Sequence, residues 1–159
     1  MHARLQSLMV AHGALVFLVG LLAGFPFAFV LLGKLTLWPL PGSIDVLLPG
    51  DVRGWRMAHL EGILNGLTLL AVAGIGARLR LSVRAQTLVA WSLIVTAWAN
   101  MLAALLGPLA GGRGLEFGHG PANSLMYLLF VAAIVAVLMA MVLVFLGAWR
   151  SRREGSSDH

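Results

Sequence analysis

The residues of this chain best suited to chemistry lie in the segment WRMAHLEGILNG, residues 55–66, where His59, Glu61 and Asn65 fall inside a long apolar run. An ionisable side chain within a membrane-spanning helix costs a few kcal/mol, so a compensating interaction is expected. An imidazole binds haem iron or another metal through one nitrogen, and we predict that His59 is such a ligand. The alternatives are a hydrogen bond to a neighbouring helix, a helix-end cap and a histidine at the membrane interface.

Two glycines share one face of the predicted helix with this histidine. At about 100° per residue, Gly62 and Gly66 fall roughly 60° and 20° from His59 around the helix axis, and Asn65 flanks them. Because a flat macrocycle needs close approach to the backbone, we predict that both glycines contact a cofactor bound to His59. Packing against another helix is the alternative for the glycines, and hydrogen bonding between helices is the alternative for Asn65 and Asn100.

The composition identifies the class of protein that holds these residues. Of the 159 residues, 60% are hydrophobic and 11% are charged, and the mean hydropathy is +0.93, whereas soluble domains have about 25% charged residues. The chain is therefore predicted to be an integral protein of a lipid bilayer. It has no cysteine, which excludes disulfides, thiolate metal sites, Fe–S clusters and covalently attached haem. Its net charge of +5 comes from arginines beside apolar runs, which indicates topology and not nucleic-acid binding.

Four apolar runs predict an all-α, integral membrane four-helix bundle, since each approximates the ~20 residues that cross a ~30 Å hydrocarbon core. The helices are expected over residues 5–32, 56–76, 85–106 and 122–149. The first run is longer than the apolar core of a secretory signal and is predicted to be a retained helix. We expect one domain over residues 1–150 and a disordered cytoplasmic tail over residues 151–159.

Two long connections join these helices. Residues 33–54, which contain several prolines and glycines, are expected to be irregular and to cover the site as a lid. Residues 107–123 form a glycine-rich turn region that contains Arg113. Glu61 is expected to reach the membrane interface or to pair with Arg56 or Arg113.

The distribution of Lys and Arg predicts the topology. Four spans place both termini on one side, and most basic residues lie on that side. The positive-inside rule therefore places both termini in the cytoplasm. In this topology His59, Asn65, Asn100 and Tyr127 lie in the outer half of the bundle, and His12 lies near the cytoplasmic end, about a membrane thickness from His59.

Several short motifs together carry a family resemblance over most of the chain. They are Ala11-His12-Gly13, Trp55-x-x-Ala58-His59, Leu64-Asn65-Gly66, Trp98-Ala99-Asn100 and Arg113-Gly114-Leu115-x-Phe117-Gly118. In their order and spacing the chain resembles the styrene oxide isomerase family, small four-helix membrane enzymes of bacterial styrene degradation. The bacterial inner membrane is accordingly the expected location.

The resemblance implies a homotrimer that holds haem b near its subunit interfaces, with His59 in the place of the axial histidine. In the family, ferric iron acts as a Lewis acid on the epoxide oxygen, and a 1,2-hydride shift gives the aldehyde. Asn65 matches the asparagine that helps to place this oxygen, and Asn100 is expected to shape the pocket. Two positions depart from the family pattern, because Ala104 replaces a tyrosine and Thr96 replaces an acidic residue.

Tyr127 is the only tyrosine of the chain, and we predict that its hydroxyl takes over the role of the missing one. The leading prediction is thus a haem b-dependent isomerase of a small apolar epoxide. A haem-binding membrane cytochrome that carries electrons and a cofactor-free membrane protein are the alternatives. A cytochrome with two axial histidines is disfavoured by the predicted separation of His12 from His59.

Overall fold

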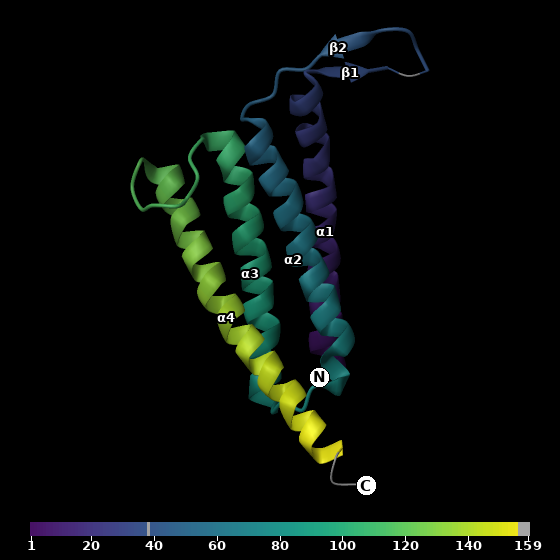
Figure 1. The fold of residues 1–159 in the computed structure, drawn as a ribbon, viewed down its shortest axis with the longest axis vertical. Coiled ribbons are helices and arrows are strands. Elements are labelled where there is room, and N and C mark those ends of the chain that lie inside the picture. The colour runs from purple at the N-terminus through teal and green to yellow at the C-terminus, as the bar shows by residue number, and fades with distance from the viewer. Residues whose placement is uncertain (38, 156–159) are drawn as a thin grey trace.

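Four long helices dominate the computed structural model, which describes residues 1–37 and 39–155 (Figure 1). They are α1 (Ala3–Leu32), α2 (Val52–Ile75), α3 (Val83–Ala110) and α4 (Pro121–Gly155), and a short 3₁₀ turn, η1 (Gly76–Arg78), follows α2. All four helices are long and apolar enough to span a membrane. The predicted all-α membrane bundle is therefore confirmed.

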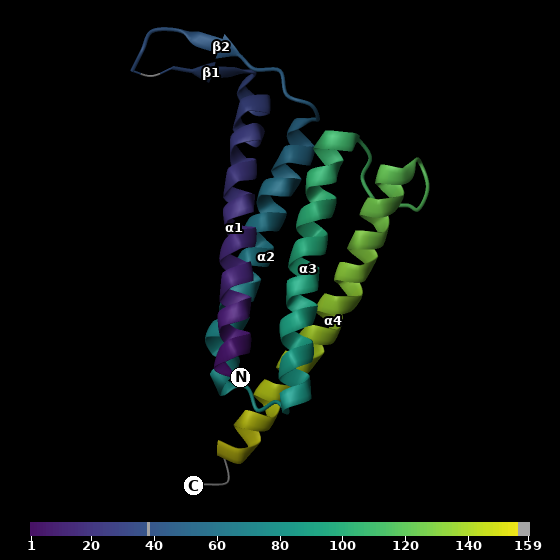
Figure 2. The same ribbon diagram turned by 180° about the vertical axis from the view of Figure 1, so that it is seen from behind.

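The helices lie side by side in chain order, and both termini lie at the same end of the bundle (Figures 1 and 2). Among the four spans, α3 is the most buried, and α1 and α4 are the most exposed. The outer surfaces of α1 and α4 are thus available to lipid or to other copies of the chain. The long connections that precede α2 and α4 both lie at the end opposite the termini (Figures 1 and 2).

Side-chain caps explain where two of the helices begin. The Asp51 Oδ1 atom accepts a hydrogen bond from Gly54 N at 2.7 Å, and α2 therefore starts earlier than the predicted residue 56. Ser82 caps α3 in the same way, with its Oγ accepting from Ala85 N at 3.3 Å. Pro121 starts α4, a position at which its missing N–H is not needed.

The connection between α1 and α2 is more regular than predicted. It contains a two-stranded antiparallel hairpin, β1 (Lys34–Thr36) and β2 (Ser43–Asp45), which projects away from the bundle beyond the end of α1 (Figures 1 and 2). The hairpin does not cover the other helices, so the prediction of a lid is wrong for this part. The segment that returns from the hairpin to α2 packs on α3, because a Cβ added to Gly50 would lie 2.6 Å from Pro108 Cβ.

The predicted tail is also partly structured, because α4 continues to Gly155. The Ser151 hydroxyl donates to Arg78 O at 2.9 Å and to Gly147 O at 3.0 Å, which ties this end of α4 to the turn after α2. The prediction of disorder from residue 151 is therefore wrong for the first turn of the tail. Residues 156–159 lie outside the described residues.

Candidate active site

His59 faces α1 and makes one specific hydrogen bond. Its Nδ1 atom lies 2.8 Å from the carbonyl oxygen of Gly20, which can only accept, so Nδ1 carries the proton. Phe27 stacks on the ring at a centroid distance of 6.1 Å, and a Cβ added to Gly24 would lie 2.9 Å from Nδ1. The bond to Gly20 fixes the tautomer whose lone pair is on Nε2, as in histidines that bind metals.

The second ring nitrogen of His59 lies at the surface of the chain. Among the described residues, Nε2 makes no hydrogen bond, and no buried side-chain nitrogen or oxygen lacks a partner. Nε2 is therefore accessible, and a ligand bound to it would extend outward from the pair α1 and α2.

The two glycines predicted to contact a cofactor instead pack against α1. A Cβ on Gly62 would overlap the Cα atom of Gly20 and lie 2.7 Å from its nitrogen, and a Cβ on Gly66 would lie 2.7 Å from the Cβ atom of Phe17. Backbone and side chain of α1 fill the space that the missing side chains leave. This arrangement is the alternative of packing between helices, since small residues allow two membrane helices to approach closely. It corrects the prediction that Gly62 and Gly66 contact a cofactor.

The structure brings Asn65 and Asn100 together across α2 and α3. Asn100 Nδ2 donates to Asn65 Oδ1 at 3.3 Å, and Asn65 Nδ2 donates to the backbone oxygen and Oε2 of Glu61 at 2.9 and 2.8 Å. Glu61 therefore binds to this amide pair. The predicted pairing of Glu61 with Arg56 or Arg113 is not observed in the described part of the chain. The spacing i, i+4 between Glu61 and Asn65 is the signal that sequence reasoning missed, since such residues are neighbours on a helix.

His12 lies deeper in the bundle than predicted. Its Nδ1 atom accepts a hydrogen bond from Trp98 Nε1 at 3.0 Å, which joins α1 to α3. It precedes Gly20, the partner of His59, by two turns of α1, or about 12 Å. The predicted separation of a membrane thickness is too large, but the two rings are still too far apart to ligate one iron.

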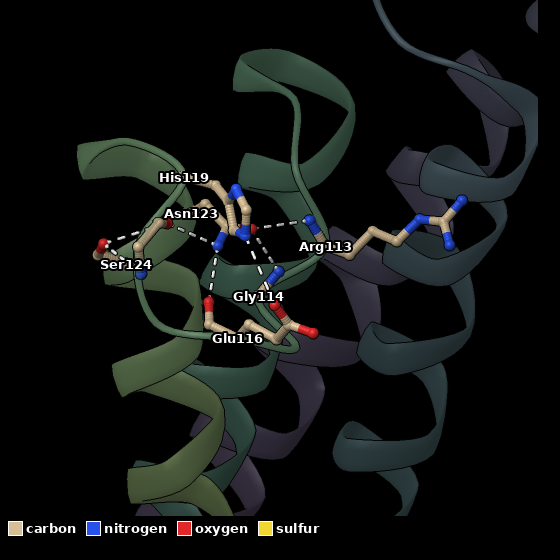
Figure 3. Close-up of polar contacts among 7 residues, drawn as sticks. Arg113, Gly114, Glu116, His119, Asn123 and Ser124 are labelled. Atoms are coloured by element: carbon tan, nitrogen blue, oxygen red, sulfur yellow. Dashed lines mark hydrogen bonds and ion pairs between the residues drawn. The ribbon is translucent and has the colours of Figure 1, made fainter.

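The connection between α3 and α4 is organised by one buried side chain, Asn123 (Figure 3). Its Oδ1 accepts from the nitrogens of Arg113 and Gly114 at 3.0 and 2.9 Å, and its Nδ2 donates to the oxygens of Glu116 and Gly118 at 2.8 and 2.9 Å. Sequence reasoning did not find this role, because the partners are backbone groups of a glycine-rich loop. These four hydrogen bonds tie the loop to the first turn of α4, and the Arg113 side chain extends away from the network (Figure 3).

This end of the bundle contains a cavity of about 510 Å³. Its walls come from the segment before α2, the first turns of α2, the last turns of α3, the loop after α3 and the start of α4. Ala104, the position where the family resemblance implies a tyrosine, lines it. Thr96, which replaces the acidic residue, is buried between helices and donates to Ser92 O at 2.8 Å and Ala133 O at 3.2 Å.

Tyr127 is not among the residues that line this cavity. Its ring packs edge-on against Phe117 at a centroid distance of 6.0 Å, and the adjacent α4 residues Met126 and Phe130 form the cavity wall instead. The structure thus brings Asn65 and Asn100 together, but it does not support the prediction that Tyr127 replaces the missing hydroxyl.

Replacing Tyr127 with Phe is accordingly expected to change kcat/KM for any accepted epoxide by less than about twofold, because the hydroxyl makes no contact with the amide pair. The comparator is Asn65→Leu, which removes a hydrogen-bonding group of that pair and should lower kcat about tenfold, the effect of one neutral hydrogen bond. A large loss in Tyr127→Phe, measured in the same detergent preparation, would restore Tyr127 to the site.

Comparison with known proteins identifies relatives of this chain. The family model described as "Styrene oxide isomerase" matches residues 5–149. A protein of Pseudomonas fluorescens named styrene-oxide isomerase is 30% identical over 137 residues, which cover 84% of this chain and 80% of the relative. The match includes the helices that hold His59, Asn65 and Asn100. This membrane protein therefore belongs to the styrene oxide isomerase family and is an epoxide isomerase.

Proposed function

We propose that this chain is a haem b-dependent isomerase that rearranges a styrene oxide-like epoxide to an aldehyde. The observation that carries the haem assignment is the orientation of His59, whose Nδ1 donates to Gly20 O and whose Nε2 is accessible. This geometry suits an axial ligand, because a ligating histidine usually donates its other ring N–H to a carbonyl or carboxylate.

The donor set of the chain also favours haem over a metal ion bound by side chains alone. Within residues 1–37 and 39–155, no three His, Asp or Glu side chains form a cluster. A haem needs only one histidine from the protein, because the macrocycle supplies four ligands of its own. The proposed ligand is therefore the single imidazole of His59.

Ferric haem bound here supplies a Lewis acid for the epoxide oxygen. Both N–H groups of the Asn65 amide are donated to Glu61, and its Oδ1 accepts from Asn100, so Asn65 positions Asn100. The second N–H of the Asn100 amide donates to the epoxide oxygen and orients it. The apolar surroundings exclude water from the cation that develops at the benzylic carbon, so hydrolysis to a diol is avoided. Substrate and product are isomers, because one hydride migrates between adjacent carbons of the same molecule, and no external oxidant or reductant is needed.

The accessible position of His59 Nε2 supports an oligomer. A haem on this nitrogen would lie against the outside of α1 and α2, and a second copy of the chain would be needed to enclose it. Because His59 bonds to α1 whereas the amide pair joins α2 to α3, the pair that faces this haem would belong to that second copy. We therefore propose the homotrimer that the family resemblance implies. Light scattering of the detergent-solubilised protein, combined with its haem-to-protein ratio, measures both the subunit number and the haem stoichiometry.

The proposed location is the bacterial inner membrane with both termini in the cytoplasm. Arg78, Arg80 and Arg84 lie in or beside the turn after α2, and Arg152 and Arg153 follow near the end of α4. These residues are at the same end of the bundle as both termini (Figure 1). The positive-inside rule assigns that end to the cytoplasm.

The experiment that tests this function combines a spectrum with isotopic labelling. The protein is purified from haem-replete cells, its absorption spectrum is recorded, and it is supplied with styrene oxide that has two deuteriums on the CH₂ carbon. We expect a Soret band of high-spin ferric haem and phenylacetaldehyde that retains both deuteriums, one on each carbon of the side chain. Absence of a Soret band would contradict haem dependence, and loss of deuterium to water would contradict the hydride shift.

A further inference from the structure

The cavity of about 510 Å³ has no role in the site described so far. Its volume lies within the range of ~300–1,000 Å³ that is usual for small-molecule sites. An apolar wall of the cavity is formed by Met57 of α2, Ala104 of α3, and Met126 and Phe130 of α4. A cavity of this size and lining suits a hydrocarbon group.

The charged residues of the cavity lie at one end of it. Asp51 caps α2, Arg53 lies in the first turn of α2, and Arg113 lies in the loop after α3. All of these segments are at the end of the bundle opposite the termini (Figures 1 and 2). The cavity is therefore polar toward the membrane surface and apolar toward the membrane interior, so a lipid-soluble molecule can be taken up at the surface and held by its apolar part.

The apolar wall continues toward the amide pair on both α2 and α3. Met57, Glu61 and Asn65 follow one another at intervals of four residues on α2, and Asn100 precedes Ala104 by four residues on α3. Four residues turn a helix by about 40° beyond one full turn and advance it by about 6 Å, so these residues share a face. The hydrogen bond between Asn65 and Asn100 thus lies within one or two turns of the cavity wall.

We propose that this cavity binds the hydrocarbon group of the epoxide, and that Ala104 determines the largest group that fits. The inference rests on the proposed function, since the amide pair holds the epoxide oxygen next to the cavity. The side chain of Ala104 is a single methyl group that lines the cavity, one turn of α3 after Asn100. The substrate class is therefore aryl epoxides with more than one ring, in addition to single-ring epoxides such as styrene oxide.

The test compares wild type with Ala104→Leu and the milder Ala104→Val on two epoxides, styrene oxide and 2-vinylnaphthalene oxide. One methylene too many in a hydrophobic pocket already discriminates between substrates by roughly 10- to 200-fold. We expect Ala104→Leu to lower kcat/KM for the two-ring epoxide at least tenfold more than for styrene oxide, with a smaller effect in Ala104→Val. The matched control is Ala110→Leu, since Ala110 is an exposed residue of α3 outside the cavity, and it should leave the ratio unchanged.

A binding measurement separates this inference from the proposed function. The unreactive hydrocarbons 2-ethylnaphthalene and ethylbenzene should both raise the thermal melting temperature of wild type, and Ala104→Leu should lose the response to 2-ethylnaphthalene. If wild type rearranges no epoxide but shows this pattern, the cavity assignment stands and the proposed function fails. The cavity assignment is overturned if Ala104→Leu affects both epoxides equally, or if neither hydrocarbon stabilises wild type because lipid or another subunit fills the cavity.

Discussion

Replacing His59 with alanine is expected to remove the Soret absorbance of the purified protein and to lower its epoxide isomerase activity by more than about a hundredfold. In the proposed function the imidazole of His59 is the iron ligand, and its Nδ1 bond to Gly20 O holds the ring with Nε2 available. Loss of a partner that only orients a metal ligand already costs about 10- to 100-fold in affinity or activity. Loss of the ligand itself should cost more.

The spectrum of the His59→Ala protein distinguishes a lost ligand from a damaged fold. His119→Ala is the matched control, because His119 lies in the loop before α4 with its side chain 74% exposed, and this variant should keep full haem and activity. Free imidazole added to His59→Ala should restore part of the Soret band by filling the vacated site. A His59→Ala protein that retains full haem would show that the ligand lies elsewhere.

Replacing Gly62 with alanine is expected to lower both the thermal stability of the protein and its haem content, although Gly62 is not expected to contact haem. The added methyl group would overlap Gly20 Cα on α1, so the two helices must move apart. Gly20 is also the residue whose carbonyl holds His59, and this separation weakens the bond that orients the ligand. Overpacking typically costs about 1–3 kcal/mol, and loss of the orienting bond should weaken haem binding by about tenfold or more.

The control for this variant is provided by the same helix. Gly74 also lies in α2, but a Cβ at this position would meet no other atom within 4 Å, so Gly74→Ala should be neutral or slightly stabilising. Melting curves and haem titrations of the two variants give a direct comparison. If Gly62→Ala behaves like Gly74→Ala, the close contact between α1 and α2 does not position His59.

Much of the architecture is determined by the sequence alone. The length and apolarity of the four runs require membrane-spanning helices, because unpaired backbone groups are too costly in hydrocarbon for other conformations. An even number of spans places both termini at one end, as Figure 1 shows. Asn65 and Asn100 were also predicted from the sequence as residues of the site, because uncharged polar groups inside a span need a partner.

The remaining features depend on which helix faces meet, and periodicity within one helix carries no information about its neighbour. Only the packed structure shows that α1 fills the space beside Gly62 and Gly66, or that Glu61 and Asn100 both bond to Asn65. The cavity beside Ala104 likewise exists because five separate segments converge there. The sequence thus determines which residues are costly in a membrane, whereas the tertiary structure decides which contacts compensate for that cost and which surfaces remain open to a ligand.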